Sequence, residues 1–442
     1  LKAARQKIEG FKDAQDYLDA LTRMTVYTRT RADYERSITR LTGEQKKALE
    51  RISLKEDFLI KGSAGTGKSL VLLKAIAKAR EGEENQGGLG LDGLHGTVAL
   101  LTYTTTLAKY DQYIEFIMAK GASGSRVSTA DAFLLERLRE IEPSARIENG
   151  LPDQLAQRFP VAGLTARDLA AEVEKFIWGN DISYEEYVLE GIERRGMKRP
   201  LGREQREAVW RASEAMIADM KGQRVYTWNG AAVLLCRALA GPGGSGVSRW
   251  DFLFIDEAQD LPAAMLKAFK ACAKRCVILA GDADQAIYQP GFSFRRAGLD
   301  IAGRSKILHT NFRNTIQLHA LAERYRRMGP GIDEASQPEA FREGPEPELF
   351  EATGLDAMLE LLIKRLELFI NVLGYAPENI CIMSPRDKDL EDIEERLSSE
   401  GLSLVDIRDR GFAFSESGSV RLSSMHSAKG LDFPVVLLFI PE

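Results

Sequence analysis

The chain has 442 residues, 44% of them hydrophobic, and a formal net charge of -5 at pH 7. This length and apolar content exceed the needs of one ordinary core, so we expect at least two domains. No apolar run approaches the roughly 18 residues of a membrane span, and we expect a cytoplasmic protein with no membrane partner. The acidic balance gives no general attraction to nucleic acid, so any such contact must use local basic or aromatic surfaces.

Residues 1–40 carry apolar positions at three- and four-residue spacings, which predict helices that form either a packing arm or the tail of another domain. Beyond them, short continuous apolar runs alternate with helical stretches. Such runs are typical of strands in a parallel sheet that is buried on both faces. They read "FLIK" (58–61), "TVALLTY" (97–103), "RVST" (126–129), "DFLFID" (251–256) and "VILAG" (277–281).

Residues 134–220 break this rhythm, because they are helical and charged with no convincing strand. We expect them to form a helical insertion in the first sheet domain. After about residue 305 a second series of strands is predicted. It reads "KILHT", "PELFEA", "NICIMSP", "LSLVDI", "SVRLSSM" and "PVVLLFI". The pattern therefore predicts an α/β protein with two parallel-sheet domains in tandem.

The four cysteines show no C-x-x-C spacing. Cys272 and Cys276 lie one helical turn apart, but no histidine cluster accompanies them, so we expect buried thiols and no metal site. The same is expected of Cys236 and Cys381.

The stretch "GSAGTGKS" follows a predicted strand and opens a predicted helix. Gly62, Gly67, Lys68 and Ser69 fill the pattern G-x-x-x-x-G-K-[ST], whose backbone N–H groups curl around phosphate oxygens. Lys68 would neutralise the β and γ phosphates, and Ser69 would ligate Mg²⁺. The alternative is a glycine-rich connector that matches by chance.

A second stretch, "DFLFIDEAQDL", ends an apolar strand in two acids. Asp256 is placed to hold Mg²⁺ with Ser69, and Glu257 to orient and deprotonate an attacking water. Taken alone, a strand that ends in solvated acids is common and has no special function. The phosphate loop upstream favours the functional interpretation of Asp256 and Glu257.

Further stretches occur in a fixed order around these two: "LTGEQKKAL", "GDADQAIYQ", "LHTNFRNT" and "MHSAKGLDFP". A nucleotide kinase or a GTPase would share the phosphate loop, but neither predicts this series. From about Leu41 to Phe439 the chain resembles the UvrD/Rep-like group of superfamily 1 helicases. The resemblance implies a P-loop NTPase with two RecA-like parallel-sheet domains, ATP and Mg²⁺ as cofactors, and single-stranded DNA, possibly with a duplex junction, as partner.

The resemblance and the strand pattern give the expected organisation. It comprises an N-terminal helical extension (1–40), a first RecA-like core in two parts (41–135 and 223–303), a helical insertion between them (136–222), and a second RecA-like core that is incomplete at its C-terminus (304–442).

The resemblance also implies roles in ATP binding and hydrolysis. Gln45 would read the adenine edge, Gln285 would sense the γ phosphate, and Arg313 would cross from the second core to that phosphate. Phe312, in place of an expected tyrosine, would stack on the base. The expected catalytic residues are Lys68, Asp256, Glu257, Gln285 and Arg313, and the other expected ATP contacts are Gln45, Gly62, Ser63, Ala64, Gly65, Thr66, Gly67, Ser69, Phe312, Gly430 and Asp432.

For DNA, the resemblance implies aromatic platforms and hydroxyl contacts. Phe294 stands where the family has tryptophan, although Phe292 could substitute for it and either could belong to the core. Asp131, Thr105 and Thr106 depart from the family pattern. The expected DNA contacts are Tyr103, Thr129, Phe133, Tyr288, Phe294 and His426.

A basic run, "ERRGMKRPLGREQR", lies in the expected insertion. Its cations, Arg194, Arg195, Lys198, Arg199, Arg203 and Arg206, either grip duplex phosphates or form a solvated face.

The two ends of the sequence carry further expectations. Only about forty residues separate "NICIMSP" from "HSAKG", so we expect the second accessory domain of the larger family members to be lacking. The sequence starts without methionine and stops at Glu442, before the family's second arginine for the γ phosphate. We therefore expect a longer natural protein, with a possible protein partner at the N-terminal helices or the missing segments.

The function implied is an ATP-dependent DNA helicase or translocase that moves 3′ to 5′ on single-stranded DNA. The alternative is a nucleotide-gated module that remodels a polymerase or nuclease partner without unwinding. A small-molecule phosphotransferase is disfavoured by the second core.

Overall fold

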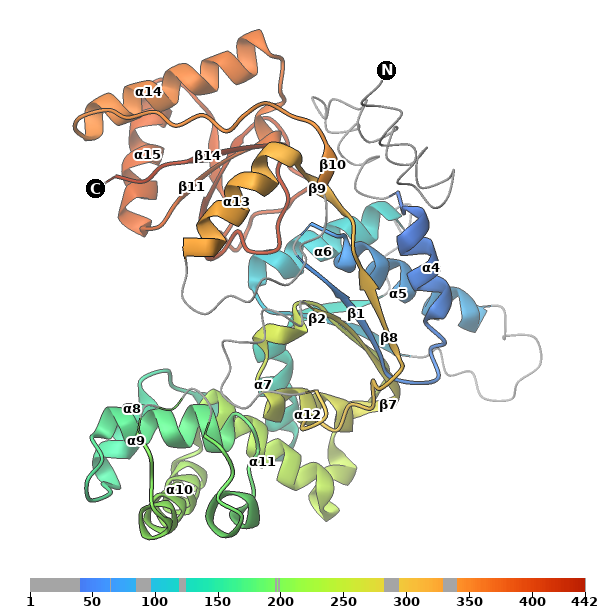
Figure 1. Ribbon diagram of the computed structural model, residues 1–442, viewed down its shortest axis with the longest axis vertical. Helices are drawn as coiled ribbons and strands as arrows, with labels where there is room; N and C mark the ends of the chain where they lie inside the picture. Colours follow the sequence, from blue (N-terminus) through green and yellow to red (C-terminus); the bar gives the residue numbers. More distant parts are fainter. Residues whose placement is uncertain are drawn as a thin grey trace.

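The computed structural model describes residues 40–63, 65–84, 97–118, 125–194, 197, 199–281, 294–328 and 340–441. Its largest sheet has six parallel strands in the order β3-β2-β6-β7-β1-β8 (Figure 1). The strands are β1 (Phe58–Gly62), β2 (Val98–Thr102), β3 (Arg126–Thr129), β6 (Trp250–Ile255), β7 (Ala273–Gly281) and β8 (Ser305–Leu308). We call the part of the chain built on this sheet the first sheet domain.

Helices cover both faces of this sheet because alternate residues of each apolar strand point to opposite sides. On one face Ile60, Leu100 and Ile278 pack against α4 (Gly43–Arg51), α5 (Lys68–Glu84) and α6 (Thr105–Met118). On the other face Leu59, Leu101 and Leu279 pack with α7 (Ala130–Ile141), α11 (Trp228–Ala240) and α12 (Ala263–Cys272) (Figure 1). The parallel sheet buried on both faces is thus confirmed.

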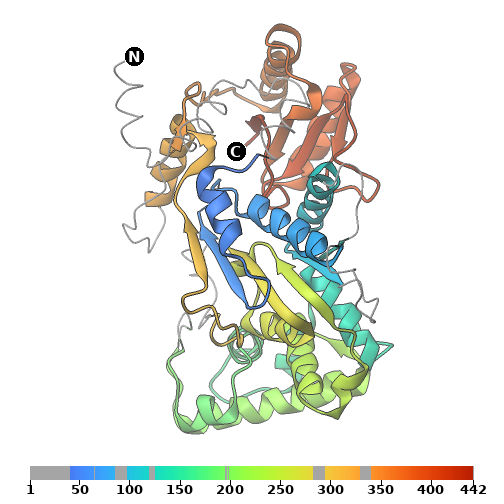
Figure 2. The ribbon, with the colours of Figure 1, turned by 90° about the vertical axis from the view of Figure 1, so that its right-hand side faces the viewer.

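The segment between β3 and β6 is mainly helical. Besides α7 and α11 it contains α8 (Leu151–Arg158), α9 (Ala166–Ala170), two π-helices (Ala171–Trp178 and Glu185–Leu189), α10 (Arg203–Gln223) and a 3₁₀ turn (Pro242–Gly246). Its two short strands, β4 (Arg146–Ile147) and β5 (Val225–Tyr226), form a separate two-stranded sheet among the described residues. Figure 2 shows this segment and the C-terminal part of the chain at opposite ends of the six-stranded sheet.

A four-stranded parallel sheet, in the order β12-β13-β11-β14, forms the second sheet domain. Leu359, Leu366, Leu390 and Ile393 of its helices pack with Ile382 of its central strand. The elements are α14 (Leu355–Glu367), a π-helix (Leu368–Val372), a 3₁₀ turn (Pro377–Asn379), β11 (Ile380–Ser384), α15 (Asp387–Ser399), β12 (Leu404–Asp406), β13 (Val420–Ser424) and β14 (Val435–Leu438). Between the two sheets lie β9 (Asn311–Thr315), which pairs with β10 (Ala340–Arg342), and α13 (Ile316–Met328).

Two predicted strands differ from the structure. "KILHT" was expected to open the second series, but β8 forms the edge of the first sheet, where Leu308 pairs with Gly62. The reason is that the free edge of β1 offers it backbone partners. "PELFEA" contains no strand.

Residues 407–414 join the two sheet domains. Phe412 and Phe414 are buried in the same core as α5 and α6, and the ring centroids of Phe414 and Tyr110 lie 5.2 Å apart. Lys109 of α6 donates a hydrogen bond to the backbone oxygen of Asp409. This contact makes the position of the second sheet domain depend on α6.

The four cysteines are buried free thiols, as predicted. No helix within the described ranges combines the length and the apolar character that a membrane span requires.

Candidate nucleotide site

The loop between β1 and α5 is held open by backbone shape. Gly65 and Gly67 have φ values of +84° and +78°, a region that favours glycine. A side chain at Gly65 would meet the amide of Asn311, and one at Gly67 would meet the amide of Gln45. These residues are glycine because the loop is covered at close range on both sides.

Lys68 begins α5 and is only 6% exposed. Its Nζ donates a hydrogen bond of 3.1 Å to the backbone oxygen of Ser63, and the Thr66 hydroxyl donates one of 2.9 Å to the same oxygen. The ammonium therefore lies across the loop at the start of the helix, where an anion would also meet the helix dipole.

Asp256 follows the last residue of β6, at the sheet edge that also carries the glycine loop. Its Oδ1 accepts a 2.9 Å hydrogen bond from the Glu257 N–H. Burial, and next the charge of Glu257, raise the pKa of Asp256 to about 6, although the nearby Ser69 hydroxyl and Lys68 ammonium act in the opposite direction. A carboxylate so placed gains strongly from a nearby cation.

The donors fit Mg²⁺. The Oδ2 atom of Asp256 is buried and has no hydrogen-bond partner among the described residues. No group of three or more His, Cys, Asp or Glu side chains that could hold a metal ion by itself occurs in the described ranges. Mg²⁺ is usually held by one or two protein ligands together with substrate phosphates, and Asp256 with Ser69 would supply that set.

Glu257 has a strained backbone, with a φ of +49° and a ψ of +41°. A non-glycine residue in this region costs free energy and is often found at functional sites. The Gln259 amide donates a hydrogen bond to Oε2 of Glu257. Gly281, at the end of β7, leaves room for this glutamine, because a side chain there would meet it.

Gln45 reaches the glycine loop from α4. Its Nε2 donates a 2.9 Å hydrogen bond to the backbone oxygen of Thr66, and its Oε1 accepts one of 2.9 Å from the Thr42 N–H. The side chain is 1% exposed. Both ends of the amide are thus engaged within the protein, and the adenine-reading role stays a prediction.

The second sheet domain reaches this site through the loop after β13. The Lys429 ammonium lies 2.6 Å from Oδ2 of Asp260, three residues after Glu257. His426 is exposed in the same loop, and Gly430, with a φ of +81°, packs against Leu107. Spacing alone could not reveal the ion pair, because its partners are 169 residues apart.

Asp432 lies two residues after Gly430 in the segment between β13 and β14. It lines a cavity with Tyr110, Asn379 and Arg421, between α6 and the second sheet, and no residue of the glycine loop lines that cavity. The predicted ATP contact by Asp432 stays a prediction.

The predicted DNA contacts fall into different environments. Tyr103, at the end of β2, is 39% exposed, and Lys429 Nζ lies 5.9 Å from the centre of its ring. The Thr129 hydroxyl caps α7 by accepting a hydrogen bond from the Ala132 N–H. Phe294 is partly buried against the core below the sheet.

The prediction for Phe133 is corrected. Its side chain is 0% exposed and packs edge-on against Phe269 at 5.3 Å, so it belongs to the core and presents no face to a base. Phe133 lies one helical turn after Thr129, on the face of α7 that packs against the sheet.

Several predicted residues lie outside the described residues: Ala64, Gln285, Tyr288 and Phe292, together with the side chains of Phe312 and Arg313.

The basic run serves the protein's own packing in its best-described members. The Arg194 guanidinium is 7% exposed and pairs with Glu172. Arg206 donates hydrogen bonds to the backbone oxygens of Tyr187 and Ile192. Neither arginine matches the solvated face or the phosphate grip. Arg199 also bonds to a backbone oxygen and Arg203 is exposed, while Arg195 and Lys198 lie outside the described ranges.

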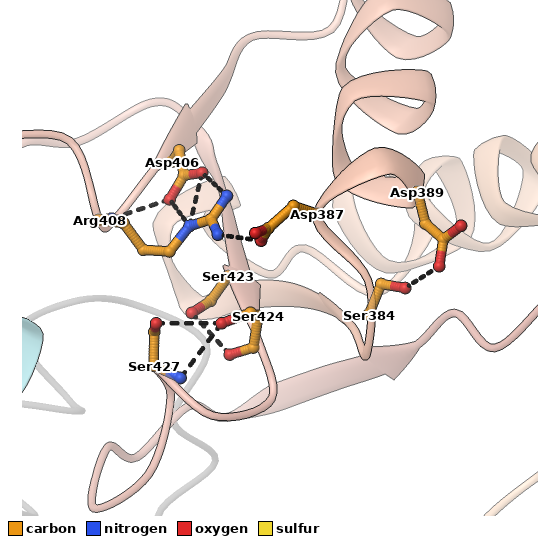
Figure 3. Close-up of polar contacts among 8 residues, drawn as sticks. All are labelled: Ser384, Asp387, Asp389, Asp406, Arg408, Ser423, Ser424 and Ser427. Carbon is orange, nitrogen blue, oxygen red and sulfur yellow. Dashed lines mark hydrogen bonds and ion pairs between the residues drawn. The ribbon is translucent and has the colours of Figure 1, made fainter. Parts of the chain in front are cut away.

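A polar cluster that the sequence did not suggest lies at the carboxyl edge of the second sheet (Figure 3). Ser384, at the end of β11, donates a 2.6 Å hydrogen bond to Asp389, and Arg408 pairs with Asp406 and Asp387. The Ser424 and Ser427 hydroxyls lie 3.0 Å apart at the start of the loop that carries His426 and Lys429. Of these contacts, the one between Ser424 and Ser427 holds the start of that loop.

A family model, the UvrD/REP helicase N-terminal domain, matches residues 244–305, which include Asp256 and Glu257. No curated protein matches the chain. The match supports a UvrD-like helicase family and a helicase-type function that depends on ATP. The mixed α/β architecture with two parallel sheets fits a P-loop helicase.

Proposed function

We propose that this protein is a DNA helicase or translocase in which two RecA-like domains hydrolyse ATP between them and move 3′ to 5′ on single-stranded DNA. The observation that carries the proposal is the ion pair between Lys429 and Asp260. It brings the second sheet domain to the edge of the first sheet where Lys68, Asp256 and Glu257 gather. A hydrolytic site at a domain boundary can convert a chemical step into relative motion of the domains.

In this proposal the side chains divide the work of phosphate hydrolysis. Lys68 neutralises the phosphates, and Glu257 accepts a proton from the attacking water. Asp256 and Ser69 would hold Mg²⁺, which supplies charge neutralisation when bound. Arg313 would add a fixed cation from β9, and Gln45 would contact the base.

The proposed strand path runs over Tyr103, with Thr129, Phe294 and His426 as further contacts. The 5.9 Å contact between Lys429 and the Tyr103 ring supports this path, because it links a base-stacking candidate to the hydrolytic edge. A base stacked on the Tyr103 ring would then displace the Lys429 ammonium and so alter its ion pair with Asp260.

The deciding experiment measures ATP hydrolysis with and without single-stranded DNA, followed by unwinding of duplexes that carry either a 3′ or a 5′ tail. Stimulated hydrolysis and unwinding from the 3′ tail are expected. Hydrolysis without unwinding or translocation would instead support the nucleotide-gated remodelling module. No DNA-stimulated hydrolysis would overturn the proposal.

A further inference from the structure

We propose that Glu44 is a positioning residue for ATP hydrolysis, which holds the chain segment that leads from the first sheet to Arg313. This role rests on the proposed function. It is separate from the roles of the glycine loop and of Gln45.

The Glu44 carboxylate accepts hydrogen bonds from two successive backbone N–H groups. Its Oε1 accepts a 2.9 Å hydrogen bond from the His309 N–H, and its Oε2 accepts one of 3.2 Å from the Thr310 N–H. Both N–H groups follow directly after β8. A carboxylate that accepts two bonds through two oxygens fixes the direction of the backbone as well as its position.

The residues on either side of His309 and Thr310 both contact the glycine loop. Before it, Leu308 pairs with Gly62 in the sheet. After it, the amide of Asn311 covers Gly65 so closely that no side chain would fit at that glycine. Asn311 is 1% exposed, and its Oδ1 accepts a 3.1 Å hydrogen bond from the Asn314 N–H, which closes a turn around Arg313. The backbone at Arg313 is therefore registered against the glycine loop by its neighbours.

Glu44 shares the first turn of α4 with Gln45, whose amide bonds to Thr66 of the same loop. The first turn of α4 thus contacts the glycine loop through Gln45 and the segment after β8 through Glu44. A shift of the loop caused by nucleotide would reach β9 through this turn. A misplacement of about 1 Å can cost about 10²-fold in rate, so the grip matters even though Glu44 touches no reacting atom.

A simpler role for Glu44 is that of an acid stabilising the N-terminus of α4. The substitution Glu44→Asp separates the two roles. Aspartate keeps the charge in the first turn, but its shorter stem cannot reach both N–H groups. The matched control is Glu50→Asp, the same change at an exposed position of the same helix.

The test measures steady-state ATP hydrolysis with saturating single-stranded DNA, and the thermal unfolding midpoint, on the full chain. For Glu44→Asp we expect kcat to fall about tenfold to a hundredfold, KM for ATP to stay within about twofold, and the midpoint to be unchanged. Glu50→Asp should match the wild type. In an Arg313→Ala background, Glu44→Asp should lower single-turnover hydrolysis no further, because the residue it positions is gone.

An unchanged kcat in Glu44→Asp, or the same fold loss with and without Arg313, overturns the role of Glu44 while an active wild type leaves the proposed function standing. A wild-type chain that does not hydrolyse ATP overturns both.

Discussion

Lys429 and Asp260 form an ion pair of 2.6 Å that joins the second sheet domain to the strand end carrying Asp256 and Glu257. Burial raises the pKa of Asp260, and the hydrogen bond from Lys429 works against that rise. Because the Lys429 ammonium also lies over the Tyr103 ring, one side chain contacts both the sheet edge that carries Asp256 and Glu257 and the proposed strand path.

Replacing Lys429 should uncouple these two regions. In Lys429→Met we expect the stimulation of ATP hydrolysis by single-stranded DNA to fall about tenfold, which is the effect of losing one charge-assisted contact. Basal hydrolysis should stay within a few fold, since Lys68 and Glu257 are untouched. The control is Lys388→Met, which removes an exposed lysine from α15. Equal stimulation in both variants would show that the ion pair carries no signal.

Glu257 and Lys68 should fail in different ways. Glu257→Gln keeps the size of the side chain and removes the base, so turnover should fall about 10² to 10⁴-fold while ATP affinity is retained. Lys68→Ala removes the cation, so ATP affinity itself should fall about tenfold or more. Equilibrium titration with a fluorescent ATP analogue and steady-state hydrolysis separate the two. If both variants lose affinity equally, the assigned roles are wrong.

The residues that local sequence could predict are those whose chemistry lies within one turn or loop. The glycine loop and Lys68 belong to this class, because a strand, a phosphate loop and a helix follow one another within a dozen residues. Asp256 belongs to it because it directly follows the apolar strand β6. The structure brings Asp256 to the edge that holds Lys68, as a parallel sheet requires.

Contacts over long separations in the chain could not be predicted in the same way. The four residues of β8, of which only Ile307 and Leu308 are apolar, do not reveal which sheet they join, and the strand was placed in the wrong domain. From the sequence, Phe133 was predicted to contact DNA, and Arg194 to contact phosphate or lie on a solvated face. In the structure both side chains are buried. Glu44 lies in the stretch "LTGEQKKAL", but nothing local indicates its role, since its partners are backbone N–H groups more than 260 residues away.

Tyr103 and Phe133 form a matched pair for testing the strand path. Tyr103→Ala should cost about 1 to 3 kcal/mol of single-strand affinity, with little sequence preference, because stacking is lost from an exposed ring. Phe133→Ala should instead cost about 3 to 5 kcal/mol of the free energy of unfolding, because it leaves a cavity beside Phe269. Fluorescence titration with labelled oligonucleotides and urea unfolding measure the two quantities. A weaker DNA affinity in folded Phe133→Ala together with a normal one in Tyr103→Ala would reverse the assignment.

The last prediction concerns Glu174 in the first π-helix. Its Oε1 accepts a 3.1 Å hydrogen bond from the Asn229 N–H, while its Oε2 is buried without a hydrogen bond to the described residues. Burial raises the pKa of Glu174 from an ordinary 4.5 to about 7, although hydrogen bonds from Thr227 and Asn229 oppose the rise. Between these two values the folded state binds more protons than the unfolded state. The free energy of unfolding therefore falls as pH rises from 4.5 to 7, and the cost is complete above pH 7.

Glu174→Gln removes this titration and keeps an oxygen for the Asn229 N–H. The gain in the free energy of unfolding over wild type should be about 3 kcal/mol larger at pH 8 than at pH 4.5. Urea unfolding followed by tryptophan fluorescence suits this test, because the four tryptophans lie in or beside the helical segment. The exposed Glu185 at the start of the second π-helix, changed to Gln, should show no such dependence. A gain that is the same at both pH values would mean that Glu174 is charged throughout, with solvent or a cation reaching its carboxylate.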